Sequence, residues 1–373
     1  MPARKSPMER FEFLMQDVHF EASQRTELIS LLCALLREGM SADEMRKAVE
    51  SKWPEFAELI TREDPWALIR AAASQGWLTF QAPIENELAS LLEKKYDWET
   101  DTLTVVHSPH FDHVALQAAQ KLLKEIRNFK TYGHLETVHI GFAGGRLLRQ
   151  VAKELATLLR GFSKHNPTKL IFHAMVAAFG DDDFEADPNN FITFFLQEPL
   201  AVSVGFVPMA APGIVETKLR PQLREFRGIR EVYKAAESLN IIVSSGGNWQ
   251  DEHSTAQTYL RRIDKDDANA LDNTSAIGDL LWQPVSDSGP VNMDDGNFTF
   301  RPNTLVDLNQ LPEAIKRGTR VLLALGPCGE CGKPKGKLLD TILKYRPQLV
   351  TDVVTNSPTA YDTLQIAFKN ERS

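Results

Sequence analysis

The chain has 373 residues, which is enough for two or three domains and a sizeable hydrophobic core. Its 43% of hydrophobic and 25% of charged residues are ordinary globular values and exclude a largely disordered chain. The net charge of −8 excludes a general polyanion binder, so any nucleic-acid contact has to come from a local basic patch.

Several further features indicate where the protein works. Residues 1–12 mix charges with no apolar run behind them, so no secretory signal is expected. No stretch of about 18 uncharged apolar residues is present, so no membrane span is expected. The 3 cysteines cannot build a disulfide framework and fit a reducing compartment. We therefore expect a cytoplasmic protein with no membrane partner.

Residues 10–98 are expected to form a small helical domain. Leucines recur at helical spacing over residues 26–37 and predict a first helix. Ser41 is followed three residues later by Glu44, and this capping-box pattern predicts the start of a second helix.

A third helix is predicted to begin at Asp64 and Pro65, because an acidic residue and a proline favour the first turn. The alternating segment at residues 77–81 then predicts a short strand. Three short helices followed by a strand are the outline of a winged helix-turn-helix.

Residues 99–368 are expected to form an α/β domain, in which apolar strands alternate with helices. The strands are predicted at residues 102–107, 137–142, 169–175, 201–207, 240–245, 320–326 and 348–354. Helices are predicted at residues 114–126, 146–159 and 223–239, and loops at residues 181–183 and 264–275. Such near-continuous apolar strands are buried on both faces, so the alternation predicts a mostly parallel sheet with helices on each side.

Ligands of open α/β sheets bind beyond the carboxyl ends of the strands. Gly144, Gly145 and Arg146 follow the second predicted strand and lead directly into a helix. Glycines at that position let backbone N–H groups approach an anion, and arginine suits a phosphate or carboxylate. The alternative is a tight turn with a solvated arginine.

Other strand ends also carry candidate ligand-binding residues. Gly246 lies in a glycine-rich segment after the fifth strand, and Lys333, Lys335 and Lys337 follow the sixth. Three cations would suit an anionic ligand if they face a pocket, and would mean nothing on a solvated loop. Asp279 could bind sugar hydroxyls or simply cap a backbone turn.

The cysteine pair and a histidine cluster suggest metal binding, but neither supports it by spacing. Cys328 and Cys331 form a CxxC motif, yet a structural zinc needs four ligands and no second CxxC exists. Pro109 interrupts the segment that carries His107, His110 and His113, so these side chains do not share a helix face. We expect no metal, and a redox role of the cysteine pair stays an alternative.

Common catalytic and cofactor motifs are absent from the sequence. It contains no GxSxG, Walker A or HExxH motif, and the glycines at residues 141–145 do not match GxGxxG. We therefore assign no catalytic residue and expect no cofactor.

The chain resembles SorC-type bacterial transcriptional regulators, which are sometimes grouped with deoxyribonucleoside regulators. Three segments carry the resemblance, which covers most of residues 100–365 and, more faintly, residues 25–98. They are residues 140–152, residues 275–289 with the Gly278-Asp279 pair, and the closing stretch 321–352.

The resemblance implies a Rossmann-like sheet of the ribose-phosphate isomerase and deaminase type, which binds a phosphorylated sugar without reacting with it. It implies an N-terminal helix-turn-helix and a homo-dimer or tetramer. Its ligand contacts would be Gly144, Gly145, Arg146, Asn190, Gly246, Asp279 and a loop lysine, Lys333 or Lys335. Arg261 or Arg262 could also reach the pocket.

The predicted helix-turn-helix has few residues that could bind DNA. Residues 41–80 hold five basic and seven acidic residues, a net charge of −2, and Arg62 and Arg70 are the candidate DNA contacts. Three hypotheses follow: a sugar-phosphate-sensing transcriptional regulator, a sugar-phosphate-binding protein without DNA binding, and an isomerase- or deaminase-like enzyme. The last would need a carboxylate or histidine base beside the ligand.

Overall fold

The protein is seen here in a computed structural model. It describes residue 14 and residues 22–37, 39–74, 81–160, 165–177, 184–197, 199–249, 251–294 and 296–370. The chain divides into two compact units, residues 1–81 and residues 82–373.

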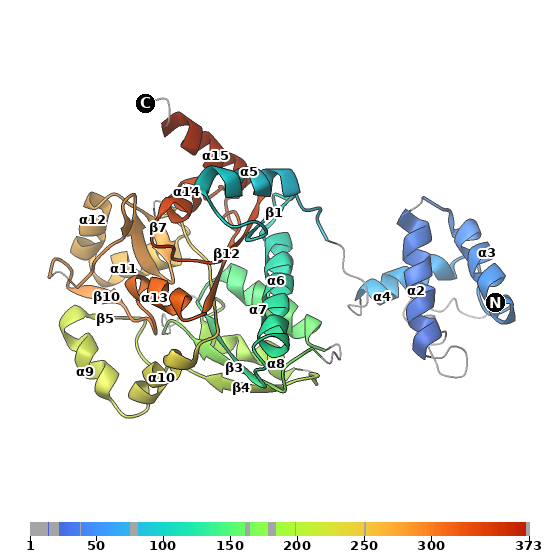
Figure 1. The fold of residues 1–373 in the computed structure, drawn as a ribbon, viewed down its shortest axis with the longest axis horizontal. Helices are drawn as coiled ribbons and strands as arrows, with labels where there is room; N and C mark the ends of the chain where they lie inside the picture. The colour runs from blue at the N-terminus through green and yellow to red at the C-terminus, as the bar shows by residue number, and fades with distance from the viewer. Residues whose placement is uncertain are drawn as a thin grey trace. The chain divides into compact units, whose positions relative to one another are not determined.

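The described part of the first unit is helical. Its helices are α2 (Ala22–Arg37), α3 (Ala42–Lys52) and α4 (Asp64–Ser74), with the 3-10 helix η1 (Pro54–Phe56) between α3 and α4 (Figure 1). They bury a shared apolar core that includes Leu28, Leu32, Met45, Val49 and Leu68. The apolar faces of the helices thus pack against one another in one core, as the apolar spacing of the sequence predicted.

Both predicted helix starts are confirmed. The Ser41 hydroxyl accepts from the backbone N–H of Glu44, and the Glu44 carboxylate accepts from the backbone N–H of Ser41. The buried Asp64 carboxylate accepts from the backbone N–H of Thr61 at 2.6 Å. The strand expected at residues 77–81 falls on positions that, apart from Gln81, lie outside the described residues.

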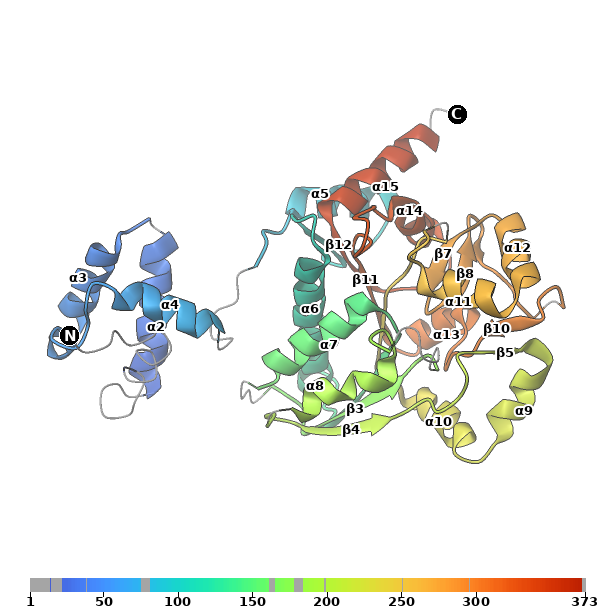
Figure 2. The ribbon, with the colours of Figure 1, turned by 180° about the vertical axis from the view of Figure 1, so that it is seen from behind.

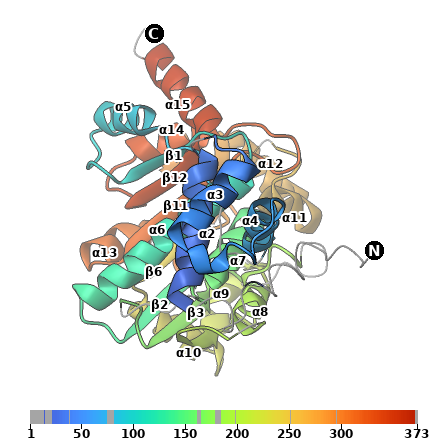
Figure 3. The same cartoon turned by 90° about the vertical axis from the view of Figure 1, so that its right-hand side faces the viewer.

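A seven-stranded parallel sheet forms the centre of the second unit, in the order β1-β12-β11-β6-β2-β3-β4 (Figure 3). The strands are β1 (Leu103–Val106), β2 (Thr137–Phe142), β3 (Lys169–Ala174), β4 (Ser203–Val207), β6 (Ile241–Ser244), β11 (Arg320–Leu325) and β12 (Asp352–Asn356). All seven predicted strands are confirmed, although β12 begins four residues later than expected. The central strands β6 and β12 are buried at every residue, which explains their near-continuous apolar sequence.

Helices cover both faces of this sheet. Helices α6 (Phe111–Thr131) and α7 (Arg146–Leu158) pack side by side, as do α14 (Gly336–Lys344) and α15 (Ser357–Asn370) (Figure 2). The β1-to-β2 and β2-to-β3 crossovers run toward the β4 edge, whereas the β11-to-β12 crossover runs toward the β1 edge. Because such crossovers are right-handed, α6 and α7 cover one face and α14 covers the other.

The strand order reverses between β2 and β6. From β2 the chain proceeds through β3 to β4, and from β6 it proceeds through β11 to β12, in the opposite direction across the sheet. Connections leave these two neighbouring strands on opposite faces, which opens a crevice beyond their carboxyl ends. Sheet topology therefore places a ligand site beyond β2 and β6.

A smaller substructure, built mostly from residues that follow β6, packs around a second apolar core. It holds α11 (Thr255–Ile263), α12 (Lys265–Asn273), a three-stranded sheet and a two-stranded sheet. The three-stranded sheet consists of β7 (Ala276–Leu280), β8 (Gln283–Ser286) and β9 (Gly289–Pro290), and the two-stranded sheet of β5 (Ile214–Glu216) and β10 (Phe300–Pro302).

Two secondary-structure predictions were wrong. Residues 264–275 are not a loop, because Asp264 caps α12 by accepting from the backbone N–H groups of Asp266 and Asp267. Residues 223–239 are not one helix. Gly228, whose φ of 91° does not fit a helix, separates the end of α9 (Arg220–Glu225) from α10 (Ile229–Ala235). A short 3-10 turn follows α10 directly.

The remaining short helices are η3 (Pro188–Asn190), α8 (Ile192–Leu196), η4 (Thr217–Leu219), η5 (Ala236–Ser238), η6 (Leu308–Gln310) and α13 (Leu311–Lys316). Among the described residues, no helix combines the length and the apolar character needed to cross a bilayer.

The division between the units falls earlier than the expected boundary at residues 98 and 99. Helix α5 (Asn86–Tyr96) packs against β1 and α15 of the second unit. The Tyr96 hydroxyl donates to Asp340 at 2.6 Å, and the Trp98 indole N–H donates to the carbonyl of Leu343 at 3.0 Å. Residues 82–98 therefore belong structurally to the α/β unit.

Candidate functional site

A cavity of about 220 Å³ lies at the strand-order reversal. Its walls come from the segments after β2, β6 and β11 and from β7, so residues far apart in sequence meet there. Its size suits a small ligand.

The first wall is the turn from β2 into α7, where Gly144, Gly145 and Arg146 line the cavity. A Cβ atom on Gly144 would lie 2.8 Å from the carbonyl oxygen of Ala186 and 2.5 Å from the Trp282 ring. Gly145 has a φ of 126° and donates its N–H to the same Ala186 carbonyl at 2.8 Å. The glycines thus let the turn pass close to two neighbours and bring the start of α7 to the cavity.

The second wall joins the segment after β6 to the side chain of Asp279 on β7. The backbone N–H of Gly247 donates to Asp279 Oδ1 at 3.1 Å. A Cβ atom on Gly247 would lie 2.7 Å from that same oxygen, so a larger residue would break the contact. The backbone of this wall is therefore built around one carboxyl group.

Asp279 is the most strongly perturbed acid of the cavity. Burial raises its pKa from the ordinary 3.8 to about 7, against the opposing charge of Lys335 and backbone hydrogen bonds from Gly247 and Trp282. Near neutral pH the carboxyl therefore exists in both forms. It can donate or accept a hydrogen bond, which suits a ligand hydroxyl.

Lys335 is the lysine that the structure brings to the cavity. Its ammonium donates to the carbonyl of Gly246 at 2.7 Å, and burial lowers its pKa. Lys333 is exposed and lies outside the cavity lining, and Lys337 forms a surface ion pair with Asp287 at 3.2 Å. The structure thus separates three lysines that the sequence could not rank.

Three helix N-termini meet at the cavity. Arg146 and Leu147 begin α7, Thr255 and Ala256 begin α11, and Lys335 immediately precedes α14. The first N–H groups of a helix lack intrahelical partners and carry the positive end of its dipole. At α14 the first of these groups, the Gly336 N–H, donates to the Asp362 carboxylate at 3.1 Å. The N-termini of α7 and α11, together with the Lys335 ammonium, therefore make the cavity favourable for an anion such as a phosphate.

Arg146 lies at the exposed edge of the cavity and forms an ion pair with Glu330, another lining residue. The pair is about half exposed on each side, so solvent screens it strongly. The arginine is therefore available to a ligand that replaces Glu330.

Two of the eight predicted ligand residues, Asn190 and Lys333, lie outside the cavity lining. Asn190 donates its side-chain amide to the carbonyl of Phe184 at 2.9 Å. Arg261 pairs with Asp272 at 2.6 Å, and neither Arg261 nor Arg262 lines the cavity. The other six, Gly144, Gly145, Arg146, Gly246, Asp279 and Lys335, are gathered there.

The histidine cluster also lies away from the cavity lining. His107 pairs with Glu85, and His113 Nδ1 lies 2.6 Å from the hydroxyl of Ser108. In the first unit, Arg62 is exposed and pairs with Asp43 at 3.2 Å, and Arg70 is exposed on α4.

Sequence reasoning missed one segment of the site, residues 251–256 at the start of α11. Asp251, His253, Ser254 and Thr255 all line the cavity. A signal was present, because Ser254 is followed three residues later by Gln257, and the Ser254 hydroxyl caps α11 by accepting from the Gln257 N–H.

Comparisons with known proteins identify the fold. No family model matches the chain, and no curated protein sequence does. Solved structures do match. The full-length sorbitol operon regulator SorC from Klebsiella pneumoniae aligns over 90% of this chain and 97% of its own, with a TM-score of 0.60 and 13% identity.

Two further structures agree. The probable sor operon regulator from Shigella flexneri aligns over 75% of this chain and 100% of its own, with a TM-score of 0.56 and 14% identity. A DeoR family transcriptional regulator from Listeria monocytogenes aligns over 74% of this chain and 98% of its own, with a TM-score of 0.53 and 18% identity. The chain thus has the fold of SorC/DeoR-type regulators, which confirms the resemblance at the level of the fold.

Proposed function

We propose that the protein is a sugar-phosphate-sensing transcriptional regulator. The cavity at the strand-order reversal carries the proposal, because two helix N-termini and Lys335 favour a phosphate while Asp279 can bind a hydroxyl. The solved structures that share the fold include the sorbitol operon regulator SorC and a probable sor operon regulator, which supports the same function. In this proposal the protein works in the cytoplasm as a homo-dimer or tetramer.

In the proposed complex, the phosphate lies between the N-termini of α7 and α11, and Lys335 supplies a charged donor. Asp279 takes a sugar hydroxyl, and Gly246 and Gly247 let the backbone approach the ligand closely. Arg146 contributes when the ligand displaces Glu330. Asn190 and Lys333 have no part in this arrangement.

The proposal is tested by measuring how the full-length protein binds DNA from its own promoter region, with and without a panel of phosphorylated and unphosphorylated sugars. We expect affinity to fall steeply with salt, and a phosphorylated sugar to change it at least about tenfold. Lys335→Ala should abolish the response to the sugar phosphate, because it removes the half-buried cation of the cavity. Lys337→Ala, two residues away on the surface, is the matched control and should respond normally.

Two outcomes would contradict regulation. DNA binding that is absent or insensitive to salt would leave a sugar-phosphate-binding protein, the alternative favoured by the acidic first unit. A sugar phosphate recovered from the protein chemically changed, as seen by NMR, would indicate an enzyme. That possibility draws on one observation, the Asp279 pKa of about 7, which suits a general base near neutral pH.

A further inference from the structure

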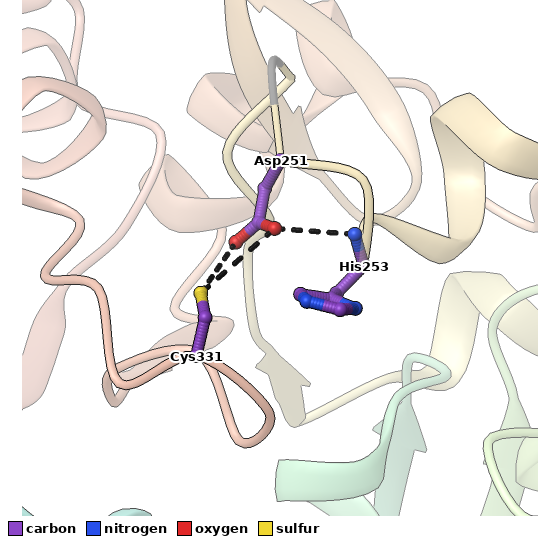
Figure 4. Close-up of side chains that lie close together, drawn as sticks. All are labelled: Asp251, His253 and Cys331. Atoms are coloured by element: carbon purple, nitrogen blue, oxygen red, sulfur yellow. Dashed lines mark hydrogen bonds between the residues drawn. The ribbon is translucent and has the colours of Figure 1, made fainter.

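Two loops at one wall of the cavity bring three metal-ligand side chains together and carry a fourth nearby in sequence. The loop after β6 carries Asp251 and His253, and the loop after β11 carries Cys328 and Cys331. Cys331 Sγ lies 3.6 Å from Asp251 Oδ2 and 4.0 Å from Oδ1 (Figure 4). The ligand atoms of Asp251, His253 and Cys331 all lie within 4.8 Å of one another.

Cys328 lies three residues before Cys331 in the same turn and lines the same cavity as Asp251 and His253. The turn is closed by the Gly332 N–H, which donates to the Cys328 carbonyl at 2.9 Å. A CxxC spacing is typical of two cysteines that bind one metal, so Cys328 is the candidate for a fourth ligand.

The separation of Cys331 from Asp251 matches that of two ligands in a tetrahedral site. With a zinc–sulfur bond of about 2.3 Å and a zinc–oxygen bond of about 2.0 Å, two tetrahedral ligands lie about 3.5 Å apart. The observed separation of Cys331 Sγ from Asp251 Oδ2 is 3.6 Å. His253 has an exposed side chain and can close the remaining separation by turning its ring.

The chemistry of the donors selects the metal. Two thiolates and one imidazole favour zinc or a similarly thiophilic divalent ion over magnesium or calcium, which prefer oxygen ligands. Four side chains also fill a tetrahedral shell, which is typical of a structural site. The CxxC motif was rejected from sequence because no second CxxC exists, but the other two ligands come from an Asp-x-His segment 80 residues away.

We propose that Cys328, Cys331, His253 and Asp251 bind one Zn²⁺, which joins the loop after β6 to the loop that carries Lys335. Zinc would thereby hold two walls of the cavity at a fixed separation. The site does not depend on the identity of the sugar, or on whether the protein binds one, so the two proposals can fail separately.

The test uses full-length protein, reduced, stripped with a chelator and freed of it, and titrated with Co²⁺ in the absence of any sugar. We expect one equivalent to bind, with tetrahedral ligand-field bands and a near-ultraviolet thiolate-to-cobalt charge-transfer band, both removed by Zn²⁺. Protein purified without added metal should contain about one zinc per chain by elemental analysis.

Cys331→Ser should lose the charge-transfer intensity of its sulfur and bind zinc at least about 100-fold more weakly, since even an outer-shell change costs about 10–100-fold. His253→Ala should also weaken binding. Cys33→Ser, which changes the cysteine of the first unit, is the matched control and should behave as wild type. Asp251→Ala is less suitable, because Asp251 also accepts from the backbone N–H of His253 at 3.1 Å.

Three results would overturn the proposal. They are no Co²⁺ binding by the fully reduced wild type, Co²⁺ binding without a thiolate band, and an unchanged band in Cys331→Ser. A thiol count of three in the reduced, metal-free protein excludes a Cys328–Cys331 disulfide as the reason for failed binding. Because Cys331 is exposed, the serine variant should match the unfolding temperature of the metal-free wild type.

Discussion

At the scale of single residues, Asp279 combines burial with a cavity-lining position. Only 4% of the residue is exposed, and its carboxyl group accepts a hydrogen bond from the Gly247 N–H at 3.1 Å. A carboxylate in such a place is costly to ionise, so the folded protein keeps its proton up to a pKa of about 7. The unfolded chain loses that proton near 3.8, and this difference links Asp279 to stability.

The sign of that link leads to a prediction for Asp279→Asn. A raised folded pKa contributes stability that is fully present below about 3.8 and is lost as the pH rises through about 7, on the order of 4 kcal/mol at most. Unfolding temperatures measured at pH 5 and pH 8 should therefore fall more for wild type than for Asp279→Asn. Asp287→Asn, at an exposed carboxylate, should fall as wild type does, and an equal fall in all three proteins would contradict the assignment.

Sequence could locate Asp279 and the Gly144–Arg146 turn because strand ends and the family resemblance both point to them. It could not choose among Lys333, Lys335 and Lys337, because a loop has no regular period from which the direction of each side chain could be predicted. Asp251 and His253 were missed for a similar reason, because their polar segment has no periodicity and precedes an unrecognised helix.

At the scale of elements, Asp307 holds several of them together. Arg220, which begins α9, donates to its two carboxylate oxygens at 3.0 and 2.6 Å, and Arg301 of β10 donates at 2.8 Å. Both arginines are at most 5% exposed. Although burial opposes ionisation, the three neighbouring arginines, Arg220 foremost, keep the Asp307 pKa below its ordinary value.

Asp307→Ala should therefore destabilise the protein by about 3–5 kcal/mol, because it leaves buried guanidinium groups without their shared carboxylate. Urea unfolding at neutral pH measures the loss. Asp294→Ala removes the exposed partner of Arg301 and should cost less than about 1 kcal/mol. Since the Asp307 pKa is lowered, its contribution is present above the ordinary 3.8 and is lost as the pH falls below it. A similar loss of unfolding free energy in the two variants would show that Asp307 does not hold these elements together.

The sequence predicted the elements of the large sheet because burial on both faces demands continuous apolar runs. It did not predict β5 and β7 to β10, which have two to five residues each and lie partly among polar side chains. The sequence of α12 predicts a loop because it is rich in aspartate and asparagine. Its signal was the cap itself, Asp264, with Asp266 and Asp267 in the first turn.

At the scale of the whole molecule, the division of the chain depends on α5. The sequence of α5 shows the same amphipathic pattern whichever unit the helix joins, so the boundary expected from sequence lies 17 residues later than the observed one. Packing assigns α5 to the second unit, because Leu88 and Leu92 are buried in the core of that unit. The bridge between Ile84 and Val106 adds a backbone connection to β1.

A fragment of residues 82–373 should therefore fold, whereas one of residues 99–373 should be strongly destabilised. The shorter fragment loses two buried leucines and the hydrogen bonds of Tyr96 and Trp98, which together exceed about 5 kcal/mol and approach the whole stability of a typical domain. Soluble yield and unfolding temperature measure the difference. Equal stability of the two fragments would place α5 outside the folded core.

The ion pair between Arg146 and Glu330 has a further consequence for any anion that enters the cavity. Glu330 is tethered beside the arginine, so it acts as a competitor with a fixed effective concentration that dilution does not reduce. A ligand must displace this carboxylate before Arg146 can bind it, and its apparent affinity is lower by that factor. Because solvent screens the exposed pair, this reduction is modest, and it matters most for a weakly binding or singly charged anion.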